Sequence, residues 1–282
     1  MNLRVQFVAV AVCAAAAFAS ADTGTNDVGL ATARRPLHLT FVADFASAYL
    51  SSSGRICDTR PIASQELDFK YSFGDNDWVD GYGWIVSSLH DRQHESHREL
   101  FNEFEGSVMY GHSFRPTERT KFICRVGALW NPTLGYHPAC WEYWGPRVAL
   151  RFDNPWVVPY LDALWLLRPE KKGRVKLGLN RAFKLTDTLT LTPSVETVWN
   201  DGVRFESSYG AAPDSPVFGG AFTALTTGLR LDWQVSEAVS LYVRYRQLDV
   251  FNPQARKSNK ESSSYYVKND YPVFSVGVTW SF

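Results

Sequence analysis

Charged side chains recur at alternate positions within apolar, aromatic-rich stretches of this 282-residue chain. The earlier stretches carry acids on one side, namely Asp44, Glu66, Asp68, Glu103 and Glu105. The later stretches carry bases on the corresponding side, namely Arg125, Arg151, Lys176, Arg230, Arg244 and Arg246. If both sets line a water-filled interior, the opposed charges would create an electric field across it, and the arginines would favour anionic solutes. Alternatively, the charges pair with one another and fill a narrow interior, and their role is then structural.

Three histidines, His90, His94 and His97, fall in one polar segment and could together bind a transition metal. Their spacing matches no established metal site, because the run from His94 to His97 is one residue short of the zinc-protease pattern. We therefore predict a solvated polar loop and no metal site.

His112 and Ser113 are adjacent in the sequence and raise the question of nucleophilic catalysis. A nucleophilic serine needs a histidine base within hydrogen-bond reach. Because neighbouring residues of a strand point to opposite faces, this pair is poorly placed to act together. The chain also contains no Gly-x-Ser-x-Gly motif and no phosphate-binding loop. We predict no catalytic residues, no enzyme activity and no cofactor.

Aromatic residues crowd one predicted loop, which contains Tyr136, His137, Trp141, Tyr143 and Trp144. Their rings could stack on sugars, or they could form part of an aromatic belt at a lipid surface, and we favour the belt.

Three cysteines lie beyond the N-terminal segment. Cys57 and Cys140 both fall in predicted loops, so a disulfide could join them in an oxidising compartment. Cys124 is expected on the lipid-facing side of a strand. Spacing alone does not determine the pairing.

The N-terminus has the features of a secretory signal peptide over residues 1–21. A basic residue, Arg4, precedes an apolar run over residues 5–18, and Ala19-Ser20-Ala21 forms a small-residue cleavage site. Residues 22–35 are polar and are predicted to be a periplasmic tail. No later stretch has 18 consecutive apolar residues, so no transmembrane helix is expected. A secreted chain belongs in the periplasm, in the outer membrane or outside the cell. The net charge is zero, which does not favour a nucleic-acid partner.

The elements that position these residues are predicted strands, because apolar and polar residues alternate from residue 36 onward. In the last stretch, Phe274, Val276, Val278, Trp280 and Phe282 share one face, opposite small and mostly polar residues. The apolar faces of the earlier stretches span residues 37–49, 67–73, 82–86, 100–114, 122–130, 148–152, 161–167, 175–183, 189–195, 225–233 and 241–245. This gives about twelve strands, separated alternately by short turns and longer loops.

That alternation of connections predicts an all-β fold, an antiparallel up-and-down transmembrane β-barrel over residues 36–282, with short periplasmic turns and long outer loops. Aromatic residues make up 15% of the chain, which suits a barrel with aromatic belts at both lipid interfaces. The main alternative is a soluble sandwich of two sheets, in which strands also alternate.

The last strand resembles that of bacterial outer-membrane β-barrel proteins, including small porin-like ones, which typically ends in Phe after alternating apolar residues. The resemblance implies that Phe274, Val276, Val278, Trp280 and Phe282 form the signal read by the barrel-assembly machinery. The enzyme precedent among such barrels is the twelve-stranded outer-membrane phospholipase, which needs neighbouring Ser and His on one strand and an orienting Asn.

Two stretches also resemble the Gcw_chp-type family of outer-membrane proteins of unassigned function. One contains Asp44-Phe45, Pro61, Gln65 and Leu67-Asp68, and the other is the hairpin at residues 183–193. The sequence departs from the family pattern at Ala46-Ser47-Ala48, where an Arg-Gly pair would be expected.

The sequence therefore predicts an outer-membrane barrel in contact with outer-membrane lipid, most simply a passive channel for small hydrophilic solutes. The first alternative is a structural or adhesive barrel that acts through its outer loops, and the second is a surface enzyme. The oligomeric state does not follow from the sequence.

Overall fold

The computed structural model describes residues 36–51, 55–89, 101–131, 143–167, 172–201, 220–256 and 268–282. One antiparallel sheet dominates it, and its long strands are β1 (Leu37–Ala46), β4 (Ile62–Ser72), β5 (Asp77–Ser88), β6 (Phe101–Thr117), β7 (Thr120–Asn131), β8 (Tyr143–Asp153), β9 (Val158–Leu166), β10 (Lys172–Asn180), β12 (Leu189–Asn200), β13 (Ala221–Gln234), β14 (Val239–Asp249) and β15 (Asp270–Ser281). A two-residue strand, β11 (Phe183–Lys184), extends the sheet beside β12. The strands β2 (Tyr49–Ser51) and β3 (Arg55–Asp58) pair only with each other.

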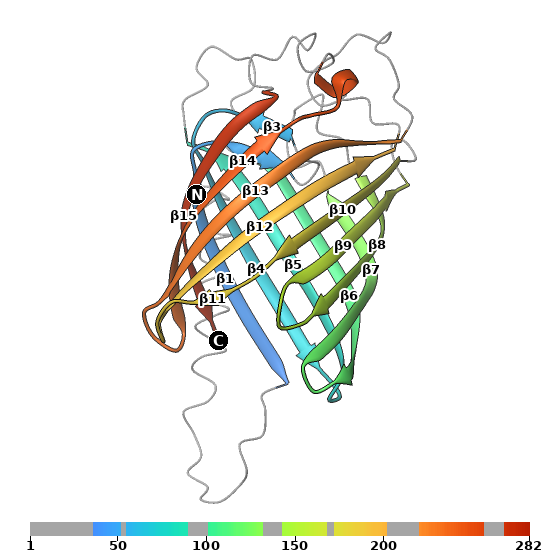
Figure 1. The fold of residues 1–282 in the computed structure, drawn as a ribbon, viewed down its shortest axis with the longest axis vertical. Coiled ribbons are helices and arrows are strands. Elements are labelled where there is room, and N and C mark those ends of the chain that lie inside the picture. The colour runs from blue at the N-terminus through green and yellow to red at the C-terminus, as the bar shows by residue number, and fades with distance from the viewer. Residues whose placement is uncertain are drawn as a thin grey trace, which may run out of the picture.

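The sheet closes on itself because its first long strand pairs with its last. β1 pairs with β15 on one side and with β4 on the other, and β10 pairs with β12 to complete the ring. The predicted antiparallel barrel of twelve strands is thereby confirmed, and the two-sheet sandwich is excluded (Figure 1). Among the described residues, no helix is long and apolar enough to cross a membrane.

Connections at the two ends of the barrel differ in length. Four residues separate β4 from β5 and β13 from β14, and two separate β6 from β7, all at the end that we call the short-turn end. Longer segments follow β1, β5, β7, β12 and β14 at the opposite end, the long-loop end (Figure 1). The predicted phase of short and long connections agrees with these strand bounds.

The outer face of the barrel is apolar and exposed. Paired residues of neighbouring strands point to the same face, so the side of one residue fixes the side of its partners. Val276 pairs with Val243 and with Phe45, and all three side chains are more than half exposed. Exposure of each such side chain to water costs a free energy of about 1.5–3 kcal/mol relative to its burial. This apolar belt is therefore suited to contact with lipid.

β5 differs from the sequence prediction in the side on which its large residues lie. The alternation grouped Tyr82, Trp84 and Val86 with the apolar outer faces, but this prediction was wrong. Trp84 pairs with Glu66 and therefore points inward. The outer face of β5 carries Gly81 and Gly83 instead, and a Cβ atom on Gly81 would come within 2.6 Å of the Phe69 ring.

Gly277 lies at the seam where the ring closes, between Asp44 of β1 and Tyr242 of β14. A Cβ atom there would overlap the Tyr242 ring and come within 2.7 Å of the Ala43 carbonyl oxygen. We expect Gly277→Val to lower the free energy of unfolding by about 1–3 kcal/mol, as overpacking does. Urea unfolding in detergent micelles, followed by tryptophan fluorescence, measures this change.

The matched control is Val276→Leu, which enlarges an exposed neighbour on the same strand. It should leave the unfolding midpoint close to that of the wild type. Equal midpoints for the two variants would contradict the close approach at Gly277.

Candidate functional site

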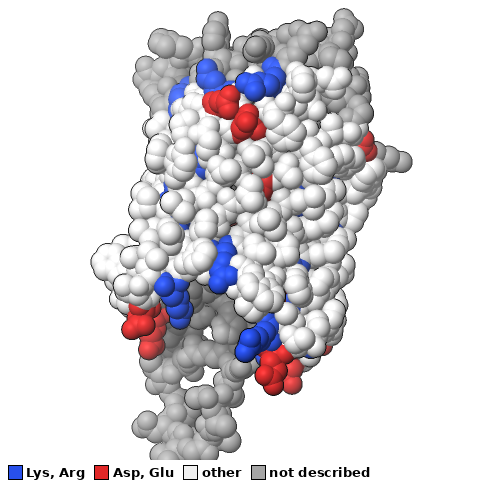
Figure 2. Space-filling view, viewed as in Figure 1, with Lys and Arg blue, Asp and Glu red and all other residues white. Residues whose placement is uncertain are grey.

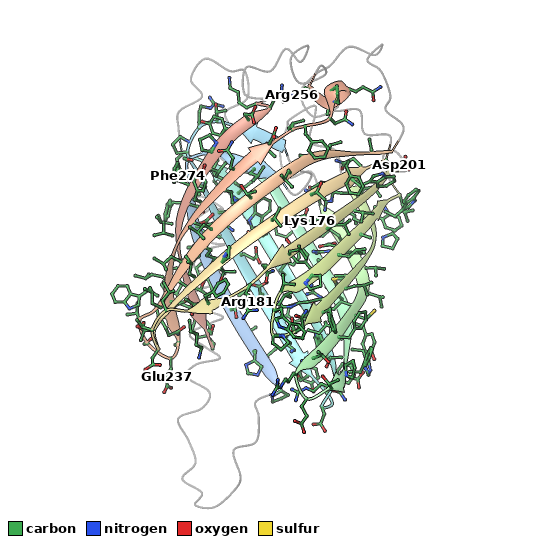
Figure 3. The ribbon with its side chains drawn as sticks, viewed as in Figure 1. Lys176, Arg181, Asp201, Glu237, Arg256 and Phe274 are labelled. Atoms are coloured by element: carbon green, nitrogen blue, oxygen red, sulfur yellow. The ribbon has the colours of Figure 1, made fainter. Side chains whose placement is uncertain are left out.

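The candidate site is the inner surface of the barrel, which we call the lumen wall. The strand register places on it every predicted charged residue whose side chain is described. These are Asp44, Glu66, Asp68, Glu105, Arg125, Arg151, Lys176, Arg230, Arg244 and Arg246. Lys176 of β10 lies midway along the barrel in Figure 3. Glu103 pairs with Val86, in the same inward register, but its side chain lies outside the described residues.

A hydrogen-bonded group joins β5, β6, β8 and β9 across the lumen wall. The Tyr82 hydroxyl donates to Glu105, and Arg147 Nη1 donates to the Tyr82 oxygen over 3.0 Å. Arg147 also forms a forked contact with Asp162, with its Nε 3.0 Å from Oδ1. Such bidentate, charge-assisted contacts fix both position and orientation. Arg147 was not predicted as a site residue, because it lies just before the alternating run that begins at Val148.

A second group surrounds Asp44 at the closing seam. The Tyr242 hydroxyl donates to Asp44 Oδ1 over 2.8 Å, and Arg244 Nη2 donates to Oδ2 over 3.2 Å. Arg244 Nε also donates to the Ser275 hydroxyl over 3.1 Å. The Arg230 guanidinium stacks on the Tyr242 ring, with its carbon 3.9 Å from the ring centre. The acid at the start of the chain is thus bound by residues near its end.

Most of the remaining bases also have acidic partners. Arg230 contacts Asp232, Lys176 contacts Glu196, Arg125 contacts Asp80 and Arg151 contacts Asp153. Four acids of these contacts and of the Arg147 group were not among the predicted site residues. They point inward among the bases, and they are Asp80, Asp162, Glu196 and Asp232. The acidic and basic walls are therefore less separate than the sequence suggested. Glu66 and Asp68 differ from these paired acids, because the side chain of each forms a hydrogen bond with the other acid.

An apolar cluster occupies the lumen at the long-loop end, and we call it the plug. Its inner part comes from the segments that follow β1 and β14, and consists of Ala48, Tyr49, Leu50, Val250 and Ala255. These residues pack on Ala46, Ile62, Val86, Ala224, Leu248 and Val273, which belong to six consecutive strands of the ring. Apolar contacts therefore cover about half of the lumen circumference at this end.

The plug contradicts the prediction for Tyr49, which the alternation placed on the outer face of the first strand. β1 ends at Ala46, and the Ser47 backbone N–H then donates to the Phe274 carbonyl over 2.8 Å. This bend turns Tyr49 inward, where its ring lies 5.9 Å from the ring of Trp84. The Tyr271 hydroxyl donates a hydrogen bond to the Thr59 carbonyl oxygen, which fixes the segment between β3 and β4.

A helical turn at residues 253–256, at the long-loop end in Figure 1, contributes Ala255 to the plug. The Asn252 side chain accepts hydrogen bonds from the backbone N–H groups of Gln254 and Ala255, which is a regular N-terminal cap. Arg256, labelled in Figure 3, contacts Asp270 over 3.2 Å and Asp249 over 3.9 Å. These contacts tie the turn to the ends of β14 and β15.

Only some residues of the other predicted sites lie in the part of the chain that the structure describes. His90, His94, His97, Tyr136, His137, Trp141 and Cys140 lie outside the described residues, as do the side chains of Cys57 and Tyr143. Trp144 lies on the outer face, paired with Trp130. Cys124 is a free cysteine on the outer face. The proposed disulfide stays a prediction.

His112 and Ser113 point to opposite faces of β6. His112 is exposed on the outer face, and its Nδ1 lies 2.9 Å from Asp77. Ser113 is buried on the inner face near Asn76. The two side chains therefore do not form a nucleophile and base pair. Phe274, Val276, Val278 and Trp280 share the outer register of β15, and Phe282, which exchanges backbone hydrogen bonds with Leu39, is exposed.

Comparison with known proteins gives a likeness of fold. No protein-family model matches the chain, and no curated protein matches it. An outer membrane channel from Pseudomonas putida F1 is similar in structure, with 11% sequence identity, a TM-score of 0.53, and coverage of 92% of this chain and 100% of that one. The NanC porin has 11% identity, a TM-score of 0.49 and coverage of 86% and 98%.

Outer membrane phospholipase A from Escherichia coli has 11% identity, a TM-score of 0.47 and coverage of 86% and 92%. The predicted resemblance to bacterial outer-membrane barrels is confirmed for the fold. The resemblance to the Gcw_chp-type family stays a prediction. The chain thus has the fold of a twelve-stranded outer-membrane β-barrel.

Two arginines on β8 allow a matched test of the lumen contacts. The Arg147 side chain is 15% exposed and its partner Asp162 is 19% exposed, whereas the Arg151 side chain is 52% exposed. Removing one member of a buried ion pair costs about 3–5 kcal/mol, but exposed pairs contribute about 0–1 kcal/mol. We expect Arg147→Met to destabilise the barrel much more than Arg151→Met. Thermal unfolding followed by circular dichroism compares them, and similar losses of stability would refute the buried network.

Proposed function

We propose that this protein is an outer-membrane channel through which small hydrophilic solutes pass passively. The observation that carries the proposal is the reversed polarity of the barrel. Its outer face is apolar and exposed, whereas its inner face carries ionic side chains that keep contact with solvent. Arg125 is 37% exposed and Arg230 is 35% exposed at their side chains. A polar interior within an apolar exterior suits an aqueous path through lipid.

The distribution of charge on the outside supports placement in a membrane. In Figure 2, Lys, Arg, Asp and Glu gather near the two ends of the barrel, and the belt between them is mostly without charge on this face. We further propose that residues 1–21 are removed as a signal peptide, and that the barrel-assembly machinery recognises the terminal strand ending in Phe282. The Pseudomonas putida protein of the same fold is described as a channel, which is consistent with this function but does not establish it.

The plug sets the width of the proposed path. Ordered apolar side chains on six consecutive strands leave less of the long-loop end for solute, so only small solutes would pass. The same observation favours a second function, a closed barrel that acts structurally or through adhesion by its outer loops. The two functions differ in permeability. We assign no catalytic role to His112 or Ser113.

Liposome swelling tests the proposed function directly. Liposomes that contain the refolded protein should swell in isotonic solutions of small sugars, and the rate should fall steeply as the sugar becomes larger. Protein that is inserted and folded but gives no swelling above protein-free liposomes would favour the closed barrel.

A charge placed inside the plug should widen the path. We expect Tyr49→Asp to increase the swelling rate and the single-channel conductance, because an unpaired carboxylate is unfavourable within an apolar cluster and should expel the β2–β3 segment. Leu89→Asp is the matched control, because Leu89 is an exposed apolar residue at the same end and is not part of the plug. If both variants conduct like the wild type, the plug does not limit passage.

A further inference from the structure

Arg246 differs from Arg230 and Arg244 because it has no ion-pair or hydrogen-bond partner among the residues that the structure describes. It points inward from β14, between Gly228 of β13 and Val273 of β15. Its Nε atom is buried and makes no hydrogen bond. Within the described part of the chain, Arg230 contacts Asp232 and Arg244 contacts Asp44, but no carboxylate lies within ion-pair distance of Arg246.

Ser194 of β12 and Arg246 of β14 lie on either side of Gly228 of β13. A Cβ atom on Gly228 would lie 2.6 Å from the Ser194 hydroxyl and 3.6 Å from Arg246 Cγ. A side chain at this position would clash with the Ser194 hydroxyl, so glycine lets that hydroxyl and the stem of Arg246 lie close to the same point of β13. Val273, next to Arg246 on β15, belongs to the plug, so Arg246 lies directly beneath the plug.

The charged groups nearby are already engaged. Arg244, Asp44 and Glu196 act electrostatically on Arg246. Asp44 contacts Tyr242 and Arg244, and Glu196 contacts Tyr160 and Lys176. These acids balance part of the positive charge, but they leave the donors of Arg246 unused. A buried charged donor without an acceptor is unfavourable, and such groups in folded proteins call for an explanation.

We propose that Arg246 binds the carboxylate of a small organic acid in the lumen beneath the plug, with the Ser194 hydroxyl as a second donor. A guanidinium presents paired N–H groups that match a carboxylate in one plane. The proposal rests on the proposed channel function and deepens it, because it names small organic acids as a solute class that the channel retains briefly during passage.

Current block measures this binding. Lactate added at constant chloride should reduce the single-channel current in a saturable way, whereas propane-1,2-diol, its neutral counterpart, should not. We expect Arg246→Met to raise the lactate concentration for half block about tenfold, as the loss of one charge-assisted hydrogen bond would. Arg230→Met removes a partnered charge from the neighbouring strand. It should change the lactate concentration for half block by less than about twofold.

Two results would overturn the site. One is an unchanged half-block concentration in Arg246→Met, and the other is an equal shift in Arg230→Met, which would indicate a general field. If the wild type carries no current, the channel function fails. Calorimetric titration of lactate into the refolded protein then decides the site separately. A heat of binding that is present in the wild type and absent in Arg246→Met supports the site. No heat of binding in the wild type refutes the site.

Stability gives an independent readout. Because Met removes an unpartnered buried charge, Arg246→Met without ligand should unfold at a urea concentration equal to or above that of the wild type. Lactate should raise the midpoint of the wild type and not of the variant. A purely structural arginine would instead lose stability on substitution and show no dependence on lactate.

Discussion

Closure of the sheet is the constraint on which the rest of this structure depends. A backbone N–H or C=O group exposed to lipid has no partner, so a sheet can cross a membrane only as a ring without free edges. Here the ring is completed between β1 and β15 and between β10 and β12. The closing register also decides which side chains face inward. Asp44 meets Gly277 across the seam, and the absent side chain of Gly277 leaves room for the Tyr242 ring.

Once the ring is closed, the interior has to accommodate charges in a limited volume. Most of them do so by pairing within one strand or with a strand up to three places along the ring, as Arg147 of β8 does with Asp162 of β9 and Tyr82 of β5. These pairs act as a scaffold that holds the lumen wall in one arrangement. Against this background Arg246 stands out among the described residues, because its Nε atom is buried without a hydrogen bond, beside Gly228 and the Ser194 hydroxyl. The plug above it restricts access from the long-loop end.

The sequence predicted the strands and the phase of the loops because a lipid-facing strand has a strict period of two. The prediction was wrong where the period of two does not show which set of residues faces the lipid and which faces the lumen. β5 has aromatic residues inside and glycines outside, so its pattern has the same period with the opposite phase. The plug was missed because Tyr49 continues the alternation of β1 in sequence, whereas in space the chain bends at Ser47. Arg246 was expected on the inward face, but its lack of a partner depends on three-dimensional distances to every acid nearby.

The most direct test of a water-filled lumen is the conductance of the refolded protein in a planar lipid bilayer, measured across a salt gradient. We expect discrete current steps of uniform size and a non-zero reversal potential, because the lumen wall carries fixed charges along a continuous aqueous path. A barrel that is shown to be folded and inserted but carries no current at any voltage would contradict it. The plug would then have to close the lumen completely, and the function would have to lie in the outer loops.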